Sequence, residues 1–196
     1  MPKSRLLVAI GDTNRGISAT IGQQQAILAA ITQLESDNPH PQPLTTAKDL
    51  LAGNWRLLYT SSQSLLKIDR FPLIKLGEIY QCIDPSQALL YNIAEITSII
   101  PNLNGLVTVI ADFMPTSDKR VNVRFNRSLI GLQSLMNYHS PTEFIQQIEA
   151  SQKFTAIDLP INVQREIPAW LEITYLDDTL RIGRGNEGNV FVLTKA

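Results

Sequence analysis

Residues 170–194 read WLEITYLDDTLRIGRGNEGNVFVLT and hold three short apolar segments joined by tight turns. The segments, Trp170 to Leu176, Leu180 to Arg184 and Asn189 to Thr194, are rich in the β-branched and aromatic residues typical of strands. Residues 177–179 suit a hairpin connection between the first two segments. The end of the chain is therefore predicted to be an antiparallel meander.

The same pattern extends towards the N-terminus, where further apolar segments alternate with turn residues. The segments are Gly53 to Thr60, Leu76 to Ile83, Ala88 to Ile96, Leu106 to Met114 and Arg120 to Ile130, with Phe154 to Ile157 as another candidate strand. Many short strands at near-regular spacing, without βαβ alternation, indicate an antiparallel sandwich or barrel.

The first part of the chain has helical periodicity. Leu6, Leu7 and Ile10 predict a short helix that stops at Gly11, and a second helix begins near Ser18 or Thr20. Apolar residues on one side of this second helix predict a packed face. They are Ile17, Ile21, Ile27, Leu28, Ile31 and Leu34. We expect one domain over residues 1–196, with a helical region at 1–37, an extended Pro-rich connector at 38–43 and the β-barrel at 50–196.

Composition narrows the function. The net charge of −1 argues against a nucleic-acid binder, which needs clustered Lys and Arg to neutralise phosphates. No stretch approaches the ~18 apolar residues of a spanning helix, so we expect a soluble or peripheral protein. Cys82 is the single cysteine, which excludes an internal disulfide, favours a reducing compartment and suggests a buried, inert thiol.

Two glycine motifs lie at the ends of the predicted sheet. Gly53-Asn54-Trp55 matches the G-x-W with which lipocalins close the bottom of their barrel, although a core tryptophan explains the residues equally well. An Arg often packs over that indole, and Arg181 and Arg184 are the candidates. Residues 183–188 spell G-x-G-x-x-G, but a strand follows them in place of a helix, so we interpret them as a hairpin turn.

The sequence offers few residues in patterns that suit catalysis. His40 and His139 have no partner at metal-ligand spacing, so no metal site is expected, and Asp177-Asp178 suits a turn. Asp112 lies in an apolar strand and calls for an ion-pair partner, for which Arg120, Arg124 and Arg127 are candidates. We expect no enzyme, an expectation that a crowded pocket of strongly perturbed carboxylates would reverse.

Residues 65–76, between the first two long strands, are apolar and dotted with Lys and Arg. In a lipocalin-like barrel this connection covers the open end, and apolar residues with flanking cations suit a lid that touches a lipid surface. A loop that only covers the barrel end is the alternative. The candidate membrane or lid residues are Leu65, Leu66, Phe71, Leu73 and Ile74.

Several separate stretches resemble the PAP/fibrillin (plastid lipid-associated) family. They are residues 12–16, 34–35, 50–61, 76–81 and 120–125 and, most specifically, 170–193, so the resemblance runs from about residue 5 to the end. It implies a lipocalin-like barrel with N-terminal helices, located peripherally on the cytoplasmic side of thylakoid membranes or on lipid globules. It also implies a non-catalytic role in photosynthetic membrane protection under stress. A chain that begins almost directly with the domain, without a transit segment, suggests a cyanobacterial member.

Two functions remain open. In the first, the barrel binds a hydrophobic small molecule such as a carotenoid, quinone or other lipid by burying its apolar surface. In the second, its own side chains fill the barrel and its outer surface contacts lipid or an unknown protein partner. The cavity volume discriminates between them. The candidate ligand-binding residues are Trp55, Leu57, Tyr59, Val107, Val109, Phe113, Val121, Val123, Phe125 and Arg181.

Overall fold

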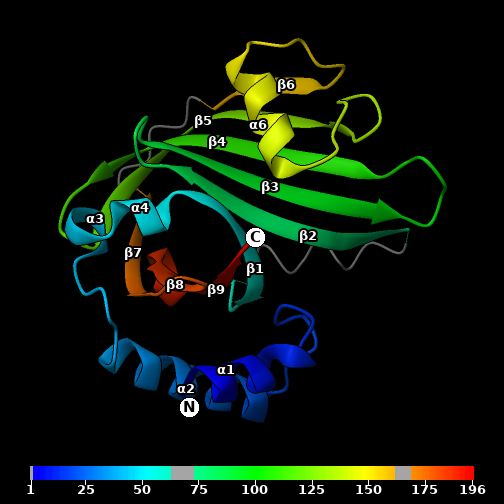
Figure 1. Cartoon of the computed structure of the whole chain (residues 1–196). Helices are drawn as coiled ribbons and strands as arrows, with labels where there is room; N and C mark the ends of the chain where they lie inside the picture. The colour runs from blue at the N-terminus through cyan, green and yellow to red at the C-terminus, as the bar shows by residue number, and fades with distance from the viewer. Residues whose placement is uncertain (1, 63–72, 162–168) are drawn as a thin grey trace.

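The computed structural model describes residues 2–62, 73–161 and 169–196, and all nine strands of this part of the chain lie in one antiparallel sheet (Figure 1). The strands are β1 Gly53–Thr60, β2 Ile74–Asp84, β3 Leu89–Ser98, β4 Gly105–Pro115, β5 Arg120–Leu132, β6 Ile157–Pro160, β7 Ala169–Leu176, β8 Leu180–Gly185 and β9 Val190–Lys195. The long predicted strands are therefore confirmed, with ends that differ by at most a few residues.

The sheet closes into a ring. Its order is β4-β3-β2-β1-β9-β8-β7-β5, and β4 also pairs with β5, so these eight strands form a closed antiparallel barrel. β6 pairs with Arg127–Ile130 of β5, outside the ring. Closure leaves no free edge among the eight strands, which confirms the predicted mainly β, lipocalin-like barrel.

Two helices, α1 (Pro2–Gly11) and α2 (Ile21–Ser36), lie together beneath β1 and β7 to β9 (Figure 1). Thr20 caps α2: its hydroxyl accepts from the Gln23 N–H, and the Gln23 side chain accepts from the Thr20 N–H. Both helices thus begin and end close to their predicted positions. The packed face is narrower than predicted, because Ile21 is 76% exposed while Ile27 and Ile31 are buried.

Further helices flank the barrel. α3 (Pro43–Thr46) and α4 (Lys48–Leu51) are single turns that follow the predicted extended connector. α6 (Pro141–Glu149), which was not predicted from the sequence, follows β5 and precedes β6 in the chain. It lies against the outer face of the sheet (Figure 1). Ser140 caps it and Pro141 occupies its first position, both recognisable start signals.

The predicted strand from Phe154 to Ile157 is wrong. β6 begins only at Ile157, and Phe154 instead packs on Phe144 of α6, with ring centroids 5.0 Å apart. These rings belong to an apolar cluster between α6 and the outer face of β2 to β5, so Phe154 contributes to helix packing rather than to the sheet.

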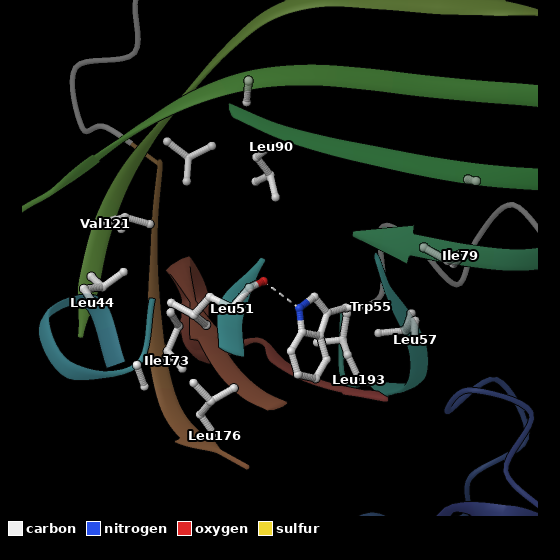
Figure 2. Packing of buried hydrophobic residues seen from close by; sticks show 14 of the residues in the cluster. Leu44, Leu51, Trp55, Leu57, Ile79, Leu90, Val121, Ile173, Leu176 and Leu193 are labelled. Carbon is white, nitrogen blue, oxygen red and sulfur yellow. Dashed lines mark hydrogen bonds between the residues drawn. The ribbon is translucent and has the colours of Figure 1, made fainter. Parts of the chain in front are cut away.

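A second cluster fills the barrel interior and includes Trp55, Leu57, Val121 and Ile173 (Figure 2). A third lies outside, between α1, α2 and the sheet, and it includes Tyr59. The change of face within β1 has a local cause. The register against β9 shifts between Leu57 and Tyr59, and such a bulge turns the following side chains to the opposite face.

Candidate functional site

One end of the barrel is closed around Trp55. Its indole N–H donates to the Leu51 carbonyl of α4 at 2.8 Å, as the dashed line in Figure 2 marks. The guanidinium carbon of Arg181 lies 5.1 Å from the centroid of the indole ring, and Lys195 Nζ lies 4.6 Å from it. The backbone at Gly53 has φ +103°, which explains the glycine of the motif. The predicted Arg–Trp contact is confirmed for Arg181.

The other candidate, Arg184, lies outside the barrel. Its Nε and Nη2 donate to the carboxylate of Glu35 in α2, both at 2.8 Å. Arg181 and Arg184 are three residues apart on one strand, so they face opposite sides of the sheet. Their roles therefore differ: Arg184 joins the helices to the barrel, and Arg181 belongs to its interior.

An apolar cavity of about 150 Å³ lies next to this closed end. Its wall comes from α3, α4, the β2–β3 turn and strands β2, β3, β4, β5, β7 and β8. At its outer edge Lys48 and Pro115 are exposed, whereas Arg181 lies in its buried part. The lining residues are Leu44, Lys48, Leu51, Ile83, Pro85, Ala88, Leu90, Phe113, Pro115, Val121, Leu171, Ile173 and Arg181.

The cavity contains three of the ten predicted ligand-binding residues, namely Phe113, Val121 and Arg181. Others lie elsewhere in the interior: Trp55, Leu57 and Val123 are in the buried core, and Val107 and Phe125 pack against it. Val109 is half-buried on the β4 face that carries Val107 and Ala111. Tyr59 was predicted to share the face of Trp55 and Leu57, but it lies in the outer cluster, because the bulge in β1 precedes it.

The other residues of the cavity wall were not predicted from the sequence. Leu44 and Leu51 come from the single-turn helices, which a reading of the connector as extended could not place at the barrel. Ile83, Leu90, Leu171 and Ile173 lie on strands that were predicted, but parity alone did not say which face points inward. Pro43 at the start of α3 is a usable signal for a helix there.

The predicted lid lies partly outside the described residues, since Leu65, Leu66 and Phe71 fall in the range 63–72. Leu73 is exposed just before β2, and Ile74 begins that strand and is half-buried. The cavity is lined by Ile83, nine residues further along β2 and about 30 Å away at strand geometry. The two described residues of the predicted lid therefore lie at the opposite end of the barrel from this cavity.

Arg181 has an unusual environment. Its side chain is 1% exposed, and its Nη2 donates to Gln81 Oε1 at 2.6 Å. Within the described part of the chain, its Nε and Nη1 have no hydrogen-bond acceptor. Burial lowers the pKa of Arg181 to about 9, which keeps the guanidinium protonated at neutral pH. The interior thus holds a positive charge next to an apolar cavity.

The remaining sequence features are structural. Burial raises the pKa of the Cys82 thiol to about 12, which fits the expected inert cysteine. Residues 186–188 form a short 3₁₀ turn between β8 and β9, which confirms that the G-x-G-x-x-G stretch is a hairpin connection. Asp112 pairs with Arg124 at 2.5 Å, as predicted.

The described residues contain no cluster of three metal-ligating side chains, and no described helix is long and apolar enough to span a bilayer.

A more polar hollow of about 250 Å³ lies between the end of α1 and strands β1 and β2. Both arginines of its lining pair with the same carboxylate, because Glu78 lies 3.8 Å from Arg15 and 3.3 Å from Arg56. Arg15 Nη2 also donates to the Leu76 carbonyl at 2.6 Å. This hollow therefore lies where the helical region joins the barrel.

A closed eight-stranded antiparallel barrel, plugged at one end by a Trp–Arg contact and hollowed beside it, defines the class of lipocalin-like barrels. The PAP_fibrillin family model matches residues 2–194, and the chain belongs to this family.

The curated relatives are plastid proteins by name. The chain is 34% identical to "Light-induced protein, chloroplastic" of Solanum tuberosum, over 98% of this chain and 66% of the relative. It is 34% identical to "Plastid lipid-associated protein 1, chloroplastic" of Brassica campestris, over 93% and 63%. It is 32% identical to "Chromoplast-specific carotenoid-associated protein, chromoplastic" of Cucumis sativus, over 98% and 67%. The chain thus spans about two thirds of their length, and no solved structure matches it.

Proposed function

We propose that this protein is a non-enzymatic lipid- or isoprenoid-binding protein that associates peripherally with thylakoid membranes or lipid globules and helps to protect photosynthetic membranes. The apolar cavity at the closed end of the barrel is the observation that carries this proposal. The names of the relatives, which include plastid lipid-associated and carotenoid-associated proteins, support the same class of ligand and a plastid-type location.

The size of the cavity limits what it can enclose. Pockets that bury a whole drug-sized ligand measure roughly 300–1,000 Å³, and this cavity measures about 150 Å³. A complete carotenoid or quinone with its prenyl tail is larger still. The barrel therefore takes one end of such a molecule, and the remainder lies outside the cavity edge near Lys48 and Pro115.

The test is native mass spectrometry of the protein purified without detergent from its own cells. The wild type should carry one lipid per barrel. Val121→Phe places a larger side chain in the cavity wall and should lose that lipid, whereas the same substitution at the exposed Val8 should keep it. A wild-type protein that is reproducibly lipid-free would contradict the carrier function.

Peripheral membrane contact is supported by an exposed apolar tip at the opposite end of the barrel. The β3–β4 connection carries Ile99, which is 67% exposed, together with exposed Ile100 and Leu103. The Ile99 N–H donates to the carbonyl of exposed Leu73 at 3.2 Å, which joins this connection to the start of β2. Apolar side chains gathered in this way suit shallow insertion into a lipid surface.

Co-sedimentation with phosphatidylcholine vesicles tests this contact. Replacing both Ile99 and Ile100 by Asp should reduce the bound fraction about fivefold or more, because two apolar side chains no longer leave water. Val8→Asp, at another exposed apolar position on α1, is the matched control and should bind like the wild type. Equal binding of all three proteins would remove the apolar tip from the proposal.

The alternative is a structural or assembly protein whose barrel is filled. The small cavity volume and the extensive interior cluster favour it over a carrier that encloses its ligand. Its signature would be unchanged vesicle binding by the Val121→Phe protein combined with no co-purifying lipid in the wild type.

A further inference from the structure

The buried arginine of β8 lacks the partners that its charge requires. Arg181 is enclosed on all sides, and its hydrogen-bonding consists of a single bond to Gln81 in the described residues. Gln81 is itself oriented, because its Nε2 donates to Asn92 at 3.0 Å. The guanidinium carbon lies 5.1 Å from the centroid of the Trp55 ring, but the indole has no acceptor atom for the guanidinium N–H groups. Two of the three nitrogens therefore have no acceptor in the part of the chain that the structure describes.

The surroundings of Arg181 are positive and apolar. Among the described residues that line the cavity, none is acidic, and the second charged one is Lys48 at the outer edge. Lys195 lies over the Trp55 ring, and its ammonium donates to the carbonyls of Leu50 and Ala52. Burial and, to a smaller extent, Arg181 lower the pKa of Lys195. Three cations thus surround this end of the barrel without a carboxylate in the cavity wall.

A structural role for Arg181 explains the contact with Trp55 but not the unsatisfied nitrogens. An unpaired donor on a buried charged group is more costly than one on a neutral group, and a methionine would fill the same space without that cost. An acceptor supplied by a ligand would satisfy the N–H groups and neutralise the charge at once. A carboxylate does both, whereas a neutral carbonyl or hydroxyl supplies only a hydrogen bond.

We propose that the cavity binds an amphiphile with a carboxylate head, which Arg181 holds in the interior while the apolar chain leaves past Lys48. This inference rests on the proposed lipid-binding function and adds the class of ligand to it. The cavity volume of about 150 Å³ fits the head and the first part of a chain. A linear fatty acid and a terpenoid acid carry the same head group, so both are candidate sources.

The test compares acids with their methyl esters, which have the same chain but no charge. The probes are cis-parinaric acid for the linear source and retinoic acid for the isoprenoid source, titrated against the full chain at pH 7. Binding is followed by probe fluorescence and by quenching of tryptophan emission. The wild type should bind at least one acid about tenfold or more tightly than its ester, the size of a charge-assisted contact. The acid that binds identifies the source.

Variants assign the effect to the site. Arg181→Met should bind the acid no better than the ester, and Val121→Phe should weaken both by filling the cavity. Arg124→Met removes an arginine whose side chain is 81% exposed outside the barrel, and it should keep the wild-type preference. If Arg181→Met does not fold, the acid–ester ratio of the wild type and the weaker binding of both probes by Val121→Phe still decide.

The outcomes separate this inference from the proposed function. Equal binding of acid and ester by the wild type would overturn the carboxylate head and leave lipid binding intact. A preference for the acid that persists in Arg181→Met would overturn the assignment to Arg181. No binding of any of the four probes would overturn the inference, and a lipid-free protein from its own cells would then remove the proposed function as well.

Discussion

Replacing Arg181 by Met should leave the stability of the protein nearly unchanged, although the residue is completely buried. The ordinary pKa of 12.5 and the value of about 9 in the barrel differ by an amount that corresponds to roughly 5 kcal/mol against the charged form. The charge-assisted hydrogen bond to Gln81 offsets about 1.5–3 kcal/mol. The contact with Trp55 offsets about 2 kcal/mol in a desolvated site. These contributions nearly cancel, so the arginine adds little net stability.

Equilibrium unfolding in guanidinium chloride at pH 7 measures the effect. We expect Arg181→Met to unfold within about 1 kcal/mol of the wild type, or to be more stable, as is common when a buried charge is replaced by an apolar side chain. The unfolded chain holds the guanidinium proton more tightly than the barrel does, so the stability of the wild type should rise relative to the variant as the pH passes about 9.

Arg184→Met on the same strand is the matched control. It leaves the largely buried Glu35 carboxylate without its partner and should cost about 1–3 kcal/mol. A loss of more than about 3 kcal/mol for Arg181→Met would refute the reasoning, because it would make the arginine a structural requirement of the barrel.

Three further substitutions test the frame around the site by equilibrium unfolding. Gly16→Ala should cost about 2 kcal/mol or more, since its Cβ would lie 2.4 Å from the Thr60 carbonyl oxygen at φ +106°, while Gly11→Ala, with open space, should be neutral. Trp55→Phe removes the hydrogen bond to α4 and weakens the cation contacts, and it should cost about 2 kcal/mol. Burial acts to raise the pKa of Asp177, but hydrogen bonds, the first from Lys3, hold it at about 2. Asp177→Asn should therefore be less stable at pH 7 and should lack the wild-type loss of stability between about pH 4 and 2; an unchanged acid limb would contradict this.

The barrel and the ends of its long strands follow from period-2 patterning, because each strand alternates between a packed face and its opposite. That pattern does not say which face points inward when both faces are covered. Here α1 and α2 cover one part of the outer surface and α6 another, so apolar residues on the outside are as common as those within. The orientation of each strand therefore depends on long-range packing that single-sequence reasoning does not contain.

Bulges are the second reason why parts of the site were missed. One extra residue in β1 moves Tyr59 to the outer cluster, and a similar shift in β7 separates Ile173 inside from Tyr175 outside. A bulge leaves no reliable mark on a single sequence, yet it reverses every side chain that follows. The shared face predicted for Trp55 and Leu57, which precede the bulge, is confirmed, and the same face predicted for Tyr59, which follows it, is wrong.

The stretch that predicts the fold also builds the deepest part of the cavity. Residues 170–194 supply three of the strands that close the ring, and the same residues place Leu171, Ile173 and Arg181 in the cavity wall. Most substitutions in this stretch will therefore change stability and binding together, so a loss of binding there does not by itself identify a ligand contact. Arg181 is the exception that the energetics single out, because its removal is expected to change binding of a charged head group while leaving the barrel as stable as before.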